Sequence, residues 1–72
     1  MCLAIYKPVG VKIDETALET GFANNDDGAG YTVRNPSGEL KTYKGFFKFK
    51  QFISYWRNHT ELEAMIHFRW MT

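Results

Sequence analysis

Near the end of the chain, every second side chain belongs to an apolar set, and the residues between them form a second set. The apolar set is Ala64, Ile66, Phe68 and Trp70, and the intervening set is Met65, His67, Arg69 and Met71. A period of two is that of a β-strand, whose successive side chains point to opposite faces of a sheet. The segment therefore predicts a strand with one apolar face and a second face that carries a histidine and an arginine.

The beginning of the chain predicts another strand and a short helix. The run CLAIYK is mostly apolar and is followed by the turn residues Pro8 and Gly10, which is typical of a strand buried on both faces. In the next segment, DETALETGF, Asp14 can cap a helix and Gly21 can end it.

A β-hairpin is predicted in the middle of the chain. AGYTVR alternates as a half-buried strand does, and the turn formers NPSG follow it. Pro36 suits the early corner of a turn, and Gly38 suits a position with positive φ. The segment ELKTYKG should therefore pair antiparallel with YTVR.

The segment FKFKQFISYWRNH predicts an amphipathic helix. Its apolar residues follow the spacing i, i+3, i+4, i+7, namely Phe49, Phe52, Ile53 and Trp56. The whole pattern predicts an α+β fold with a small, mostly antiparallel sheet and two helices, in a single domain over residues 1–72.

Composition limits the function classes. Apolar residues make up 44% of the 72 residues, enough for a packed core. Cys2 is the one cysteine, so no intramolecular disulfide can form, and the cysteine and histidine spacing fits no zinc site. No apolar run approaches the ~20 residues of a membrane span, and no signal peptide precedes the first strand. We expect a cytoplasmic protein with no metal, no cofactor and no membrane association.

Net charge is +1 overall, but residues 34–57 carry six basic side chains against Glu39 alone. Basic side chains among aromatic ones can neutralise phosphates while bases stack. A nucleic-acid site is therefore one alternative, with these residues as its contacts: Lys41, Lys44, Lys48, Lys50 and Arg57. The competing interpretation is a solvated basic surface over a small core.

Single motifs have ordinary structural explanations. A cysteine in an apolar run is most often a buried small residue, and DDGAG is a turn because glycine adopts backbone angles that other residues resist. His59 and His67 are expected to be surface or hydrogen-bonded histidines.

Taken in order, three of these motifs resemble the class II glutamine amidotransferases, a family of N-terminal nucleophile (Ntn) hydrolases. They are Cys2 after the initiator methionine, NNDDGAGY after a short helix or loop, and HFRWMT in a late strand. The motifs look especially similar to those of short members predicted in phage genomes. The resemblance implies a sheet with two helices like the front half of the Ntn-hydrolase sandwich, in which two sheets pack between helix layers.

The resemblance also implies site residues. Removal of Met1 gives Cys2 a free α-amino group, which has a pKa of ~7.7–8.0 and can act as the base for its own thiol. Arg69 of the His67-x-Arg69-x-x-Thr72 motif would hold the α-carboxylate of a glutamine-like ligand, with His67 and Thr72 assisting. Asp27, Gly28 and Gly30 would shape the turn near this site.

The family's Asn-Gly oxyanion pair would follow Thr72, and Asn24 and Asn25 do not replace it. We therefore expect a reduced amidotransferase domain that works mainly as a protein-binding module, with a protein partner or a second copy of itself, and with catalysis lost or weak. The alternatives are a glutamine amide hydrolase that uses Cys2 and the nucleic-acid-binding protein described above.

Overall fold

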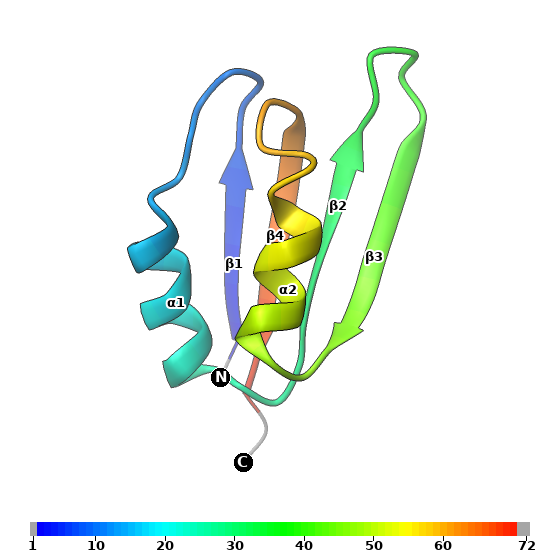
Figure 1. Ribbon diagram of the computed structural model, residues 1–72. Coiled ribbons are helices and arrows are strands. Elements are labelled where there is room, and N and C mark those ends of the chain that lie inside the picture. The colour runs from blue at the N-terminus through cyan, green and yellow to red at the C-terminus, as the bar shows by residue number, and fades with distance from the viewer. Residues whose placement is uncertain (1, 71–72) are drawn as a thin grey trace.

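The computed structural model describes residues 2–70. Its elements are β1 (Cys2–Lys7), α1 (Glu15–Asn24), β2 (Ala29–Arg34), β3 (Leu40–Phe46), α2 (Phe49–Trp56) and β4 (Glu63–Arg69). The strands form one antiparallel sheet in the order β1-β4-β2-β3, and both helices lie on the same side of it (Figure 1). The predicted α+β class, with a small antiparallel sheet and two helices, is confirmed.

The last strand, β4, lies between β1 and β2 and is antiparallel to both. Each helix therefore connects two strands that are separated by another strand: α1 connects β1 to β2 across β4, and α2 connects β3 to β4 across β2. The predicted hairpin joins β2 and β3, and Gly38 in its turn has a φ of +89°. This strand order brings the beginning of β1 beside the end of β4, where Cys2 is opposite Arg69 (Figure 1).

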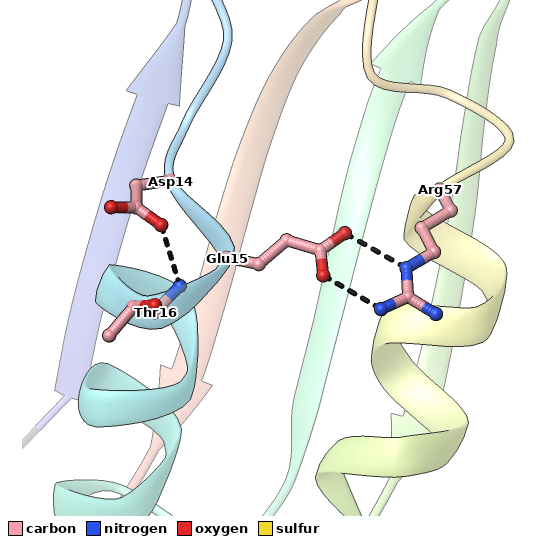
Figure 2. Close-up of polar contacts among 4 residues, drawn as sticks. All are labelled: Asp14, Glu15, Thr16 and Arg57. Carbon is pink, nitrogen blue, oxygen red and sulfur yellow. Dashed lines mark hydrogen bonds and ion pairs between the residues drawn. The ribbon is translucent and has the colours of Figure 1, made fainter.

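Helix α1 begins as predicted and ends later than predicted. The Asp14 side chain accepts a hydrogen bond from the Thr16 backbone N–H at 2.9 Å (Figure 2). The helix continues through Gly21, which the sequence predicted as its end. A Cβ at this position would lie 3.0 Å from Leu3 Cδ2 and 3.2 Å from the Phe68 ring, so Gly21 allows α1 to approach the sheet closely.

A bidentate ion pair joins the beginning of α1 to the residue after α2. The Arg57 guanidinium donates from Nε and Nη2 to the Glu15 carboxylate at 2.9 and 2.7 Å (Figure 2). These hydrogen bonds hold the pKa of Glu15 below its usual value.

The core fills the space between the helices and the sheet. Its buried side chains are Leu18, Phe22, Ala29, Tyr31, Val33, Phe46, Phe52, Ile53, Trp56, Ala64, Ile66 and Phe68. Three of the four residues in the predicted stripe of α2 are buried, and Phe49 packs partly buried against them. Tyr31 lies among the aromatic rings, and its hydroxyl is 2.8 Å from Nδ1 of His59. The expectation of a hydrogen-bonded histidine is thus confirmed for His59.

Two expectations about strand burial are wrong. β1 is an edge strand with one exposed face, because β4 pairs with it on one side only and the helices cover only one face of the sheet. Trp70 was predicted on the apolar face of the last strand, but β4 ends at Arg69 and Trp70 is 42% exposed.

Candidate functional site

The face of the sheet opposite the helices carries the candidate site, and we call it the open face. Residues directly opposite one another in neighbouring strands share a face. The strand registers therefore place these residues on the open face: Cys2, Ala4, Tyr6, Gly30, Thr32, Arg34, Leu40, Thr42, Lys44, Glu63, Met65, His67 and Arg69.

Cys2 and Arg69 are direct cross-strand partners on the open face. The Cβ atoms of such partners lie about 4.5–5.5 Å apart. Both side chains are exposed, so the interpretation of Cys2 as a packed apolar residue is wrong. The cause is the edge position of β1, which leaves this face of the strand in solvent.

His67 lies two residues before Arg69 on the same strand and face. It is directly opposite Ala4 of β1 and Gly30 of β2. The structure thus brings together Cys2, His67 and Arg69 at the end of the open face where the chain begins. Thr72, the last residue of the predicted motif, lies outside the described residues, as does Met1.

A pocket of about 270 Å³ opens beside Arg69, and we call it the glycine pocket. Its lining residues are Asp27, Gly28, Ala29, Gly30, Lys44, Gly45, Phe47, His67 and Arg69. The turn that contains Asp27 and Gly28 is held against β4 by two backbone hydrogen bonds. Asp27 N–H donates to the Arg69 carbonyl at 2.7 Å, and Arg69 N–H donates to the Gly28 carbonyl at 2.8 Å.

Three glycines explain why a sheet surface is hollowed here. Gly28 and Gly45 have φ values of +138° and +86°, which side-chain-bearing residues rarely adopt. Gly45 is the extra residue of a β-bulge, because Ala29 is opposite Phe46 while Gly30 is opposite Lys44. A Cβ on Gly30 would lie 2.9 Å from the Tyr43 carbonyl oxygen. Bulges of this kind redirect the side chains beside them.

At the opposite end of the open face, one ion pair lies beside exposed apolar side chains. Tyr6 O–H and Arg34 Nε both donate to the Glu63 carboxylate, and these hydrogen bonds lower the pKa of Glu63. Leu40 and Met65 beside them are 58% and 47% exposed. All five side chains contribute to one shallow pocket of about 220 Å³.

The predicted basic residues divide between the two sides of the sheet. Lys44 lines the glycine pocket on the open face. Lys41 lies on the helix side, as do Lys48 and Lys50 at the start of α2, and Arg57 is paired with Glu15. Lys44 was predicted only as a phosphate contact, and Gly45 and Phe47 were not predicted as site residues. The glycine inside the strand TYKGF is the signal that could have indicated a bulge.

Within residues 2–70, no group of three or more histidine, cysteine or acidic side chains could hold a metal ion. No helix in the same range is long and apolar enough to span a membrane. No protein-family model, curated protein or solved structure matches the chain.

Proposed function

We propose that this chain is a class II amidotransferase-type domain that binds glutamine-like amides at the open face, with Cys2 as the nucleophile once Met1 has been removed. The observation that carries the proposal is the register that makes Cys2 and Arg69 direct neighbours, with His67 beside them. An arginine offers a planar fork of donors suited to a carboxylate. A glutamine held by its α-carboxylate at Arg69 can present its side-chain amide to the adjacent thiol.

The chemistry follows from these two groups. The α-amine of Cys2 takes the thiol proton, and the thiolate sulfur attacks the amide carbonyl carbon. Breaking the C–N bond releases ammonia, which receives that proton, and leaves a thioester on Cys2. Water then hydrolyses the thioester to the free carboxylate and regenerates the thiol.

The proposal is tested by intact-mass measurement of protein that lacks Met1, after exposure to a glutamine-mimicking chloroketone. We expect one adduct on Cys2, none on Cys2→Ser, and protection by L-glutamine. Arg69→Gln should slow labelling about tenfold or more, because a hydrogen bond to a charged group contributes about 1.5–3 kcal/mol. Arg34→Gln is the matched control, because Arg34 is an exposed arginine at the other end of the same face. Equal labelling rates in the two arginine variants would contradict the proposal.

A second candidate function is protein binding through the open face. It is favoured by the exposed apolar side chains Tyr6, Leu40 and Met65, which gather where no helix covers the sheet. We propose a second copy of this chain as the partner, so that two sheets stack face to face as in the family that the chain resembles. Four strands about 4.8 Å apart and about 20 Å long give a footprint of roughly 400 Å² per copy. This is small for a stable interface, so the dimer should be weak.

Light scattering over a range of protein concentrations tests this second candidate. We expect the average mass to rise with concentration and Met65→Lys to abolish the rise. Val11→Lys is the control, because Val11 is exposed to a similar extent, 48%, but lies in a loop. A monomer at all concentrations, or equal effects of the two variants, would exclude the dimer.

A further inference from the structure

The glycine pocket has basic side chains on two opposite walls. Lys44 is directly opposite Gly30 on one side, and His67 is directly opposite Gly30 on the other. Because β3 and β4 flank β2, the backbones of these two walls lie about 10 Å apart, two strand spacings. Gly30 has no side chain, so the space between the walls stays open.

The basic groups on these walls differ in chemical type. Arg69 and His67 form the β4 wall, with a guanidinium fork and an imidazole, and Lys44 contributes a compact ammonium group from β3. Asp27 is the acidic residue of the lining, and its backbone hydrogen bond to Arg69 puts it at the β4 end of the pocket.

We propose that the glycine pocket binds a small molecule with two anionic groups, one at Arg69 and the other at Lys44. A short dicarboxylate has this chemistry, and a pocket of about 270 Å³ suits a ligand of that size. The exposed ring of Phe47 offers an apolar contact for the carbon chain between the two groups. The second anionic group distinguishes this ligand from glutamine, and its binding requires no chemistry at Cys2.

The experiment is an NMR titration of the ¹⁵N-labelled chain at fixed ionic strength with glutarate, valerate, L-glutamine and inorganic phosphate. Glutarate and valerate have the same number of carbons and differ in the second carboxylate. We expect glutarate to bind about tenfold more tightly than valerate, with shifts at the amides of Gly28, Gly30 and His67. One charge-assisted contact is sufficient for a difference of that size.

Two lysine variants locate the second anionic group. Lys44→Gln should reduce glutarate affinity to that of valerate. Lys41→Gln should leave it unchanged, because Lys41 is on the same strand but opposite Val33, on the helix side of the sheet. Both substitutions remove one positive charge, so general electrostatic attraction affects them alike.

The proposal would be overturned by equal affinities for glutarate and valerate, by equal effects of the two lysine variants, or by tighter binding of glutamine than of glutarate. Tighter binding of phosphate than of glutarate would also overturn it and would indicate a compact-anion site. Labelling of Cys2 is measured separately, so failure of the proposed hydrolase and failure of this dianion site give different results.

Discussion

Replacing Gly30 by alanine should destabilise the protein, although the same exchange in an unobstructed strand stabilises it. Alanine in place of glycine ordinarily gains about 0.5–1 kcal/mol through lower backbone entropy of the unfolded chain. At this position, however, the Cβ would lie 2.9 Å from the Tyr43 carbonyl oxygen and 3.1 Å from Lys44 Cβ. The carbonyl belongs to the backbone of β3 and cannot rotate away as the end of a side chain can.

Overpacking of this kind costs about 1–3 kcal/mol, so the steric cost exceeds the entropic gain. We expect a net loss of about 1 kcal/mol, which lowers Tm by about 4–8 °C in a domain of this size. Urea and thermal unfolding followed by circular dichroism measure both quantities.

The reverse exchange Ala4→Gly supplies the matched control. Ala4 and Gly30 are both opposite His67, one on each side, so they lie in the same row of the open face. Ala4→Gly should cost about 0.5–1 kcal/mol from backbone entropy alone. A Gly30→Ala protein as stable as the wild type, or more stable, would show that the space above Gly30 is available and that the steric argument is wrong.

Three further changes test the electrostatics and hydrogen bonding of the fold. Because the pKa of Glu15 is lowered in the folded state, its ion pair contributes stability above pH 4.5 that is lost as pH falls through the folded pKa. In urea unfolding, Glu15→Gln should therefore be less stable than the wild type at pH 7 and equal to it at pH 2. Burial disfavours the charged form of Lys7, which is 1% exposed, and so lowers its pKa. Lys7→Met should therefore be more stable than the wild type at pH 7, and this advantage should shrink as pH rises toward 10.5, where the wild-type amine loses its charge in either state. An advantage independent of pH would contradict the burial argument. Tyr31→Phe removes the hydroxyl bonded to His59 and should cost about 1 kcal/mol; an unchanged Tm would show that the bond contributes nothing.

Local signals in the sequence predicted the elements well. The spacing of Phe52 and Trp56 predicted α2, the side chain of Asp14 predicted the start of α1, and the NPSG turn predicted the β2–β3 hairpin. Each signal acts within a few residues, through helical periodicity, a cap or a turn. Gly21 was misinterpreted because a glycine required by close packing looks the same in sequence as a glycine that ends a helix.

The sequence by itself determined which segments form strands and which side of the last strand carries His67 and Arg69, because alternation is a property of the segment alone. Only the tertiary structure decided that β4 lies between β1 and β2, that Cys2 is opposite Arg69, and that Lys44 and His67 flank Gly30. Pairing between strands far apart in sequence depends on which order lets both helices cover one face and bury the core together. No local pattern encodes that choice, because its free energy belongs to the assembled layers and not to any one segment.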